Sequence, residues 1–432
     1  MLSSLRIVVT GLIAQHHRLG GVAWDYIQYP VGLSRLGHDV YYFEDSGEWP
    51  YSTVDAVTPK DCSANVQHLN HVMTRFGLAD RWAYRCPITA TWHGLTNKRR
   101  REIIGSADVL INVSGVLQRP LNYRKIPRLV YVDSDPVFTQ IKLALDRGHK
   151  RFQKRLNSHD VFFSFGENIH AWSQLPDSDR QWLPTRQPIL LSEWNSESSV
   201  RDEYTTVMSW TSYKPLRYQG LVFGQKDTEM LRFIDLPRRV RPGLELALAG
   251  TGHTKWQRVK LDGGSSAHDD EVTRFKGRYP GVTTSSKDFL QRAGWTVIDG
   301  LATCKDMDSY RRYIESSKAE WSVAKNGYVR GESGWFSCRS ACYLAAGKPV
   351  VVQDTGFGRA IPVGDGILSF DDMGEAVAAI EDIEANYTRH SRAAREIARE
   401  YFFAEHVLAG LVEDALACGR SQKRNLSKLG NG

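Results

Sequence analysis

The amino-acid sequence predicts an α/β protein made of two Rossmann-like, doubly wound domains. Its 432 residues exceed what one ordinary hydrophobic core organises, so two or three domains are expected. The predicted strands are short, continuous apolar runs, which are typical of parallel strands covered on both faces. Helical segments separate these runs, and this alternation favours parallel sheets.

The first domain is predicted to span residues 1–190. Its strands are expected at Leu5–Thr10, Asp39–Phe43, Ala107–Val113, Arg128–Val132 and Val161–Ser164. Helices are expected at Ala23–Leu36 and around Val66–Phe76. A proline-bearing and polar stretch follows, which is typical of a linker, and the linker is assigned to residues 191–204.

The second domain is predicted at residues 205–395. Its strands are expected at Thr205–Trp210, Leu244–Leu248, Trp295–Ile298, Glu320–Ala324 and Pro349–Gln353. Helices are expected at Asp308–Ser317, Ser337–Ala346, Gly374–Asn386 and Ser391–Tyr401, with a polar excursion loop at Gly263–Ser286. Residues 396–432 are expected to form a helix that returns to the first domain and a basic tail.

The composition is that of an ordinary globular protein, with 41% hydrophobic and 24% charged residues. The sequence contains no apolar run of about 18 residues or more, and its opening becomes polar too soon for a signal peptide. The six cysteines have neither the density of a disulfide framework nor the spacing of a zinc site. They are therefore expected to be reduced, in a cytoplasmic protein.

The net charge of +7 is concentrated in basic patches. These patches lie at residues 97–101, 149–151, 238–241 and 423–428. Such patches bind a nucleic-acid backbone or a small anionic substrate, and they also simply favour solubility. The charge alone leaves these three interpretations open.

The most informative stretch runs from Trp321 to Gly358. It is predicted to form a strand, a glycine-bearing loop, a helix beginning at Trp335, a buried strand and a second glycine loop. Free backbone N–H groups at a helix N-terminus suit a phosphate, and loops at the carboxyl ends of parallel strands form a ligand crevice. The alternative is that these glycines serve only as turn and cap residues.

The chain resembles the GT-B class of nucleotide-sugar glycosyltransferases. The carrying residues are Gly20-Gly21, the Gly-His-Asp-Val step at 37–40, Ala345–Val351, Asp354–Gly358, Gly364–Leu368 and Tyr401–Phe403. The resemblance implies two domains that face a cleft, with the acceptor held by the first and the sugar donor by the second. Retaining members carry two glutamates where this chain has Gly334 and Cys342, which leaves the stereochemical outcome open.

The resemblance implies a donor site for a nucleotide-diphospho sugar, with UDP as the expected carrier and no obligatory metal. Fixed cations and helix N-termini stabilise a departing diphosphate. Asp354 is expected to accept a ribose or sugar hydroxyl. The expected donor residues are Lys214, Arg217, Lys226, Arg330, Gly331, Glu332, Ser333, Gly334, Trp335, Asp354, Thr355, Gly356 and Phe357.

The candidate catalytic bases are His16 and His17, which follow the first predicted strand. A strand-end loop is where inverting GT-B members often hold their histidine, and an imidazole suits proton removal from an alcohol. Asp25 is the reserve candidate. The alternative is that both histidines are polar surface residues.

The acceptor side is predicted to include glycines, aromatic rings and two aspartates. Aromatic rings stack on sugar faces. Asp133-Ser-Asp135 has the Asp-x-Asp pattern with which the GT-A class holds a divalent cation, although such strings are also common in turns. The expected acceptor-side residues are Gly20, Gly21, Trp24, Trp92, His93, Asp133 and Asp135.

The predicted activity is transfer of a sugar, as by a hexosyltransferase, to a hydroxyl group. Small metabolites, glycans, proteins and hydroxymethylated bases in DNA remain open as acceptors, and no membrane span is expected. The alternatives are a nucleotide-sugar epimerase of the same architecture and a non-catalytic nucleotide-binding protein.

Overall fold

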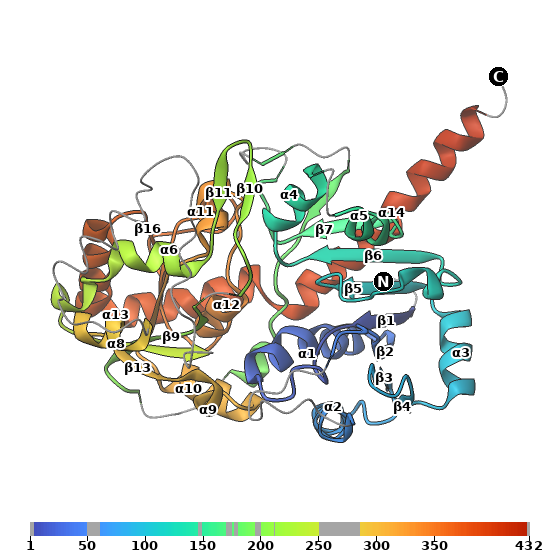
Figure 1. Cartoon of the computed structure of the whole chain (residues 1–432), viewed down its shortest axis with the longest axis horizontal. Helices are drawn as coiled ribbons and strands as arrows, with labels where there is room; N and C mark the ends of the chain where they lie inside the picture. The colour runs from blue at the N-terminus through green and yellow to red at the C-terminus, as the bar shows by residue number, and fades with distance from the viewer. Residues whose placement is uncertain are drawn as a thin grey trace. The chain divides into compact units, whose positions relative to one another are not determined.

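The protein consists of two compact units, Met1–Glu193 with Tyr401–Gly432 (unit 1) and Trp194–Glu400 (unit 2), as the computed structural model shows (Figure 1). The structure describes residues 4–49, 61–145, 149–169, 175–176, 180–194, 200–210, 212–249 and 286–429. The loop expected at Gly263–Ser286 lies almost entirely outside these residues, and so does the end of the basic tail.

In the described part of unit 1, eight strands form one sheet in the order β4-β3-β2-β1-β5-β6-β7-β8. Neighbouring strands are parallel except for the antiparallel pair β3 and β4. The strands are β1 (Arg6–Thr10), β2 (Asp39–Glu44), β3 (Trp82–Arg85), β4 (Trp92–Gly94), β5 (Val109–Val113), β6 (Arg128–Asp133), β7 (Val161–Ser164) and β8 (Trp182–Pro184). The prediction missed β3, β4 and β8, which are too short to produce a continuous apolar run.

The helices of unit 1 are α1 (Gly20–Arg35), α2 (Ser63–Arg75), α3 (Asn97–Ser106), α4 (Phe138–Ala144), α5 (Lys150–Leu156) and α14 (Ala404–Leu429), with 3-10 turns at Pro120–Tyr123 and Leu191–Glu193. The first two predicted helices are present, with α1 starting at Gly20, ahead of the expected Ala23, and α2 at Ser63, whereas α3, α4 and α5 were not predicted. Helix α14 belongs to unit 1 because Ala404 N–H donates to the Ile189 carbonyl (3.0 Å) and α14 packs on α1.

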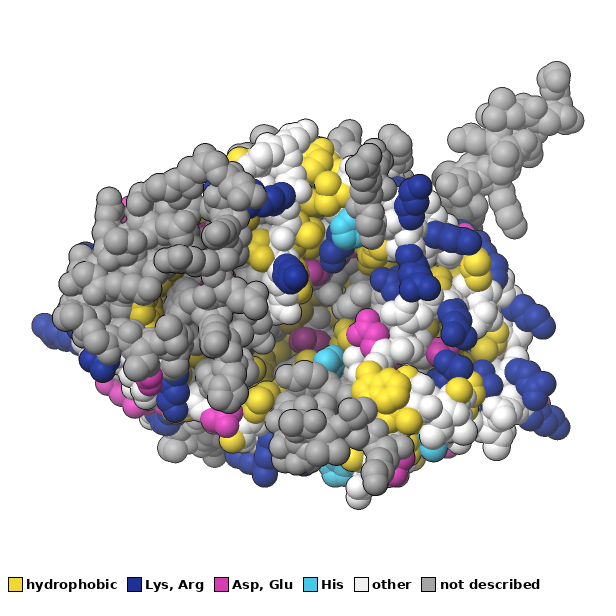
Figure 2. All heavy atoms as spheres, viewed as in Figure 1, with side chains coloured by type: hydrophobic (Ala, Val, Ile, Leu, Met, Phe, Trp, Pro, Cys, Tyr) yellow, Lys and Arg dark blue, Asp and Glu magenta, His cyan; other side chains and the backbone are white. Residues whose placement is uncertain are grey.

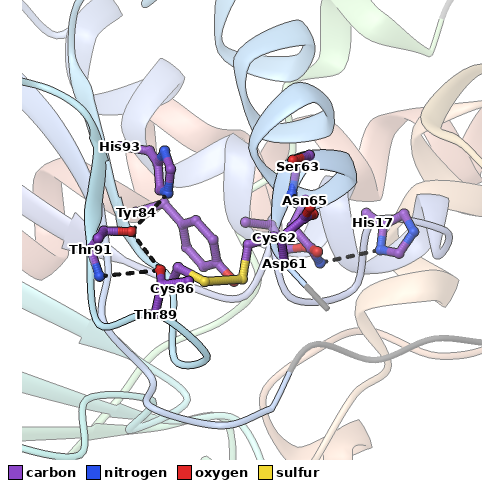
Figure 3. Close-up of a disulfide and its surroundings, with 11 residues drawn as sticks. His17, Asp61, Cys62, Ser63, Asn65, Tyr84, Cys86, Thr89, Thr91 and His93 are labelled. Carbon is purple, nitrogen blue, oxygen red and sulfur yellow. Dashed lines mark hydrogen bonds between the residues drawn. A yellow bond between two sulfur atoms is a disulfide. The ribbon is translucent and has the colours of Figure 1, made fainter. Parts of the chain in front are cut away.

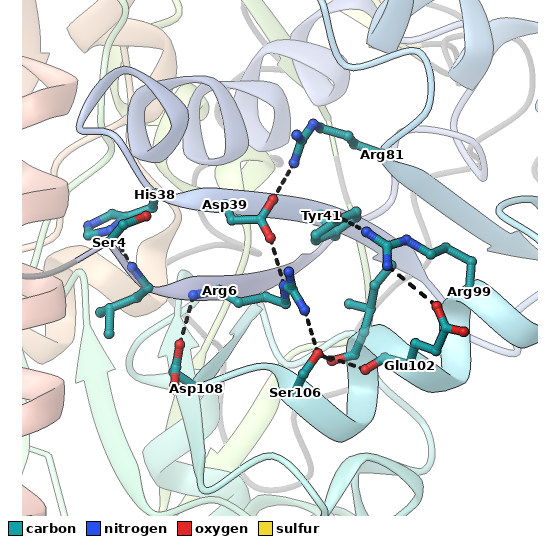
Figure 4. A network of polar contacts seen from close by, with 12 residues as sticks. Ser4, Arg6, His38, Asp39, Tyr41, Arg81, Arg99, Glu102, Ser106 and Asp108 are labelled. Atoms are coloured by element: carbon teal, nitrogen blue, oxygen red, sulfur yellow. Dashed lines mark hydrogen bonds and ion pairs between the residues drawn. The ribbon is translucent and has the colours of Figure 1, made fainter.

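Charged residues connect the amino-terminal ends of the central strands in unit 1 (Figure 4). Arg6 donates from Nε to Asp39 on the neighbouring strand β2 (2.6 Å), and Arg81 pairs with the same carboxylate. These two guanidinium groups lower the pKa of Asp39 although partial burial opposes them. Arg99 of α3 donates to the Tyr41 hydroxyl (2.9 Å). The network contributes modestly to stability because its groups remain partly exposed.

In the described part of unit 2, six parallel strands form the sheet β13-β12-β9-β14-β15-β16. They are β9 (Glu203–Ser209), β12 (Gly243–Ala249), β13 (Thr296–Asp299), β14 (Ala319–Ser322), β15 (Val350–Gln353) and β16 (Ile367–Phe370), with a separate hairpin of β10 (Leu216–Tyr218) and β11 (Leu221–Phe223). In each large sheet the strand order reverses at one point, between β1 and β5 and between β9 and β14. Ligands of open α/β sheets bind at such points, outside the carboxyl ends of the strands.

The helices of unit 2 correct one prediction. The expected loop before the nucleotide-site helix contains a short helix, α11 (Asn326–Gly331), and the next helix α12 (Cys338–Ala345) begins three residues later than Trp335. The others are α6 (Lys226–Met230), α8 (Ser286–Ala293), α9 (Gly300–Thr303), α10 (Met307–Ser316) and α13 (Met373–Tyr401), with 3-10 turns at Leu231–Phe233, Leu236–Arg238 and Phe357–Arg359. The two predicted C-terminal helices are merged in α13, which has a non-helical Asn386 (φ −132°) between them.

Aromatic residues form much of the unit 2 core. Trp321 of β14 is buried and stacks on Phe370 of β16 with ring centroids 5.6 Å apart, and Trp295 lies 5.0 Å from Trp321. The prediction of two doubly wound α/β domains is confirmed. Among the residues that the structure describes, each helix is too short or too polar to cross a membrane.

The packing of α14 on α1 can be tested at Gly32. A Cβ atom there would lie 2.5 Å from Leu408 and 3.1 Å from Ala404. We expect Gly32→Val to lower the free energy of unfolding by about 1–3 kcal/mol because the added side chain would overpack the contact between α1 and α14. Gly410→Ala on α14 is the control, since its Cβ would meet nothing within 4 Å and should gain up to about 1 kcal/mol. Urea titrations of both variants measure this, and equal stabilities would contradict the observed helix contact.

Candidate functional site

A cavity of about 470 Å³ lies at the carboxyl ends of β14, β15 and β16 in unit 2. Its lining comes from the segments that follow these three strands, namely Val329, Glu332, Asp354, Gly356, Gly358, Arg359 and Asp371. Since the three strands are parallel neighbours, segments far apart in the sequence meet at one edge of the sheet. This is the position at which open α/β sheets bind ligands.

The two predicted donor loops are in direct contact at this cavity. Gly334 N–H donates to the Thr355 carbonyl (2.8 Å), and the Thr355 hydroxyl donates to the Trp335 carbonyl (2.6 Å). Gly356, at φ +83°, donates its N–H to Asp354 (2.8 Å) and needs a backbone that side chains rarely adopt. The fold therefore brings together residues 331–335 and 354–357, as the sequence predicts.

Buried polar atoms without a protein partner accompany these loops. Among the described residues, Ser333 Oγ, Trp335 Nε1 and Gln225 Nε2 are buried and have no hydrogen-bond partner. Ser333 is fully buried, and the Trp335 ring stacks on Tyr328 with centroids 4.3 Å apart. Because buried polar groups in folded proteins are almost always hydrogen-bonded, these atoms indicate a place for a polar ligand.

Cations gather at the point where the strand order of unit 2 reverses. Lys226 begins α6, and burial together with nearby Arg339 and Lys325 lowers the pKa of its ammonium well below the usual value. Arg339 connects the two strands: it pairs with Glu320 of β14 (2.6 Å) and donates to the Val207 carbonyl of β9 (2.7 Å). Lys226 is thus confirmed at the start of a helix.

Lys325 is a candidate that the sequence analysis missed. It lies three residues after the end of β14, donates to the Tyr213 hydroxyl (2.9 Å) and lies over the Tyr213 and Tyr328 rings. Its position after a predicted strand was the signal that could have found it. The predicted cations Lys214 and Arg217 are exposed, and Arg330 is exposed and donates to the Val222 carbonyl (3.2 Å). None of these three lines the cavity described above.

Glu229 of α6 fixes the loops around this cavity and was also missed. Its side chain is buried and accepts hydrogen bonds from Asn326 (2.7 Å) and Gln353 (2.5 Å), and it pairs with Arg232 (2.7 Å). Asn326 follows β14 and Gln353 ends β15. One carboxylate therefore ties together three segments, a role that no local pattern in the sequence marks.

In unit 1, the histidine loop that follows β1 is held by a buried carboxylate. Glu44, the last residue of β2, accepts the N–H groups of Ala14 (2.8 Å) and Gln15 (2.7 Å) and the hydroxyl of Tyr42 (2.9 Å). Burial raises the pKa of Glu44 to about 7 although these hydrogen bonds oppose the shift. The loop thus leaves the carboxyl end of β1 in a fixed conformation.

Both candidate histidines lie in this loop, and each is partly exposed. Burial lowers the pKa of His16, with the Glu48 carboxylate opposing the shift, and burial and Arg18 lower the pKa of His17. His17 Nδ1 lies 3.3 Å from Asn65 Nδ2 of α2, and the same amide donates to the Ala14 carbonyl (2.7 Å). Both imidazoles are therefore mainly neutral near pH 7, the form that accepts a proton.

A disulfide joins Cys62 and Cys86 next to this loop (Figure 3). Cys62 directly precedes α2, which carries Asn65, and Cys86 follows β3. The prediction that all cysteines are reduced is wrong for this pair. The cysteines are 24 residues apart, and the tertiary fold brings the start of α2 to the end of β3. Cys304, Cys338, Cys342 and Cys418 carry thiols rather than disulfides.

Two acceptor-side predictions are corrected by burial. Trp24 is 0% exposed, and its ring meets Phe76 edge to face with centroids 6.0 Å apart, so it is a core residue. Asp133 is 2% exposed and accepts from Thr139 (2.7 Å) and Gln140 (3.2 Å). Burial raises the pKa of Asp133 to about 6, and the side chain organises its own loop.

The remaining predicted residues of unit 1 are accessible to different degrees. Gly20 is buried and Gly21 partly exposed at the start of α1, where Asp25 is also partly exposed. Trp92 and His93 lie on β4, and His93 Nε2 contacts the Thr91 hydroxyl (3.3 Å). Asp135 is partly exposed and its N–H donates to Asp133 (3.1 Å). The described residues contain no group of three or more His, Cys, Asp or Glu side chains that could hold a metal.

No protein-family model matches the sequence, and no curated protein matches it. Solved structures do match. An α-glucosyltransferase in complex with UDP-glucose and DNA containing an abasic site aligns with a TM-score of 0.54 and 11% identity, over 96% of this chain and 100% of that chain. An α-glucosyltransferase in complex with UDP aligns with a TM-score of 0.53 and 12% identity, again over 96% and 100%.

The chain has the GT-B fold. The alignment spans both units, so the architecture expected from the glycine-bearing motifs is confirmed. The cavity at the carboxyl ends of β14, β15 and β16 lies in unit 2, the second of the two domains.

The buried Glu44 gives the stability a specific pH dependence. Its pKa is raised from 4.5 to about 7, so the folded state binds the proton more tightly than the unfolded chain does. This contribution is complete below about pH 4.5 and is lost as the pH rises through 7. Between pH 5 and 8, we expect the free energy of unfolding of wild type to fall by on the order of 2 kcal/mol relative to that of Glu44→Gln. Denaturant titrations measure the difference, and parallel curves would contradict a protonated Glu44.

The disulfide predicts a redox-dependent stability. Cross-links of this loop length stabilise by about 2–4 kcal/mol, mainly by constraining the unfolded chain. We expect Cys86→Ser to unfold at lower urea concentration than wild type without reductant, and the difference to shrink when dithiothreitol is added. Cys304→Ser, at a free buried cysteine, is the control whose difference from wild type should not respond to reductant. Non-reducing peptide mapping that lacks the Cys62–Cys86 cross-linked peptide would refute the pairing.

Proposed function

We propose that the chain is a glycosyltransferase that moves a sugar from a nucleotide-diphospho sugar, with UDP as the carrier, to a hydroxyl group of an acceptor. The observation that carries the proposal is the unit 2 cavity, where two glycine loops meet beside buried polar atoms that have no hydrogen-bond partner among the described residues. Support also comes from the fold, because similar structures are α-glucosyltransferases in complex with UDP or UDP-glucose.

The donor is assigned to the loops at the carboxyl ends of β9, β14 and β15. Lys226 and Lys325 would face the diphosphate, whose negative charge would favour the charged form of Lys226 that burial and nearby Arg339 now disfavour. Ser333 and Trp335 would hydrogen-bond the ligand. Asp354 uses one oxygen for the Gly356 N–H, and its other oxygen is assigned to a ribose or sugar hydroxyl. No metal is required in this scheme.

The acceptor hydroxyl is assigned to the histidine loop of unit 1. His16 or His17 is the proposed base, since a neutral imidazole takes the proton as the hydroxyl oxygen attacks the sugar. Asp25, partly exposed on α1, remains the reserve. Gly21, Trp92, His93 and Asp135 remain acceptor-side proposals.

The acceptor is proposed to be a small molecule, a glycan or a hydroxymethylated base in DNA. Similar α-glucosyltransferases are in complex with DNA, one of them a 13-mer containing an HMU base, and unit 1 carries basic patches. A cytoplasmic location is proposed. Disulfides such as Cys62–Cys86 are more common in oxidising compartments. Formation of a glycosylated acceptor would distinguish transfer from epimerisation and from binding without turnover.

The donor site can be tested with UDP. We expect UDP at 100 times its Kd to stabilise the protein by about 2.7 kcal/mol without Mg²⁺. Lys226→Met should weaken UDP binding about tenfold, because a charge-assisted contact is lost. Lys305→Met, at an exposed lysine of the same unit, is the matched control and should bind UDP as wild type does. Calorimetric titration measures the UDP affinity of wild type and of both variants. Absence of UDP binding to wild type would refute the proposal.

A further inference from the structure

Unit 1 contains a second cavity, of about 180 Å³, that the donor site does not use. Asp45, which directly follows β2, and Arg85, which ends β3, line it at the carboxyl ends of their strands. The segment after β5 contributes Arg119 and Tyr123, and α3 contributes Arg100. Neighbouring strand ends and one covering helix therefore form the walls.

The cavity carries an excess of positive charge. Its lining holds three arginines, Arg85, Arg100 and Arg119, against the single carboxylate of Asp45. Asp45 is engaged already: it accepts the Tyr123 hydroxyl (3.1 Å), and Arg85 lies 3.8 Å away. Among the described residues, neither Arg100 nor Arg119 has an acidic partner within 4.0 Å.

Arg100 is held in place without having its hydrogen bonds satisfied. Its guanidinium lies 3.8 Å from the centre of the Trp92 ring, and one terminal nitrogen donates to Asn97 (3.0 Å). Its Nε is buried and has no hydrogen-bond partner in the part of the chain that the structure describes. Burial is the main cause that lowers the pKa of Arg100. A buried donor of this kind costs free energy unless an acceptor occupies the cavity.

The size and chemistry of the cavity select the ligand. Pockets for whole drug-sized ligands measure about 300–1,000 Å³, so this cavity suits one small group rather than a nucleoside. Guanidinium groups match the tetrahedral oxygens of phosphate through paired N–H donors. Three arginines against one carboxylate leave two positive charges, which balances a phosphomonoester of charge about −1.5 to −2.

We propose that Arg85, Arg100 and Arg119 form a subsite for a phosphomonoester group carried by the acceptor. The proposal rests on the glycosyltransferase function in that it names the acceptor class, and the binding itself can be tested separately. Lys98 and Arg99 are exposed cations on the same helix as Arg100, and their positive charge attracts anions to this part of unit 1. Figure 2 shows Lys and Arg side chains gathered over the part of unit 1 where Figure 1 places α3.

The first experiment measures binding of inorganic phosphate to the full-length protein by calorimetry, with saturating UDP to occupy the donor loops. We expect Arg119→Gln and Arg100→Gln each to weaken phosphate binding about tenfold, because a charge-assisted contact is lost. Arg101→Gln is the matched control, since it removes the same charge from α3 outside the cavity and should stay within about twofold of wild type. Arg119 is exposed, so its variant remains informative if Arg100→Gln fails to fold.

The second experiment identifies the source of the phosphate and separates the two proposals. Glucose 6-phosphate should bind with the same arginine dependence, and glucose should not. Equal phosphate affinity in wild type and both variants would overturn the subsite. Arginine-dependent binding of a short DNA duplex, without binding of phosphate or glucose 6-phosphate, would also overturn it in favour of a nucleic-acid contact. If UDP does not bind but phosphate binds as expected, the donor proposal fails and the anion site stands.

Discussion

Buried carboxylates hold the loops around the candidate sites of both units. Glu44 ends β2 and accepts two N–H groups from the loop after β1, while Glu229 on α6 joins Asn326, which follows β14, to Gln353, the last residue of β15. A carboxylate can be buried only where hydrogen bonds or cations compensate for the lost hydration. The loops that supply those donors are therefore fixed in position, and the geometry of each candidate site depends on that requirement.

In unit 2, connected loops lie beside buried polar groups that have no hydrogen-bond partner among the described residues. Gly334 and Thr355 connect the two glycine loops, whereas Ser333 Oγ and Trp335 Nε1 lack partners among the described residues. Lys226 has a lowered pKa beside Arg339, a state that an anionic ligand would relieve. Perturbed pKa values and unpaired buried donors are common at functional sites because a bound ligand offsets their cost in free energy.

Unit 1 places two different chemical environments at neighbouring strand ends. The loop after β1 presents neutral imidazoles, and the cavity at the ends of β2 and β3 presents guanidinium groups. The Cys62–Cys86 disulfide connects the start of α2, which carries Asn65, to the end of β3, which carries Arg85. It therefore links an element that contacts the histidine loop to an element that lines the arginine cavity. These two environments are the basis for proposing a phosphorylated alcohol as the acceptor.

The sequence by itself determined the alternation of strands and helices, the two doubly wound domains and the glycine loops at 331–335 and 354–357. These features are local, because apolar runs and glycine at positive φ are encoded within a few residues. Tertiary structure alone decided that Trp24 and Asp133 are buried, that Lys214 and Arg217 are exposed, and that Cys62 meets Cys86. It also decided the contacts of Glu229 and Arg100. Strand order and register set these contacts between distant segments, and no local pattern of residues records them.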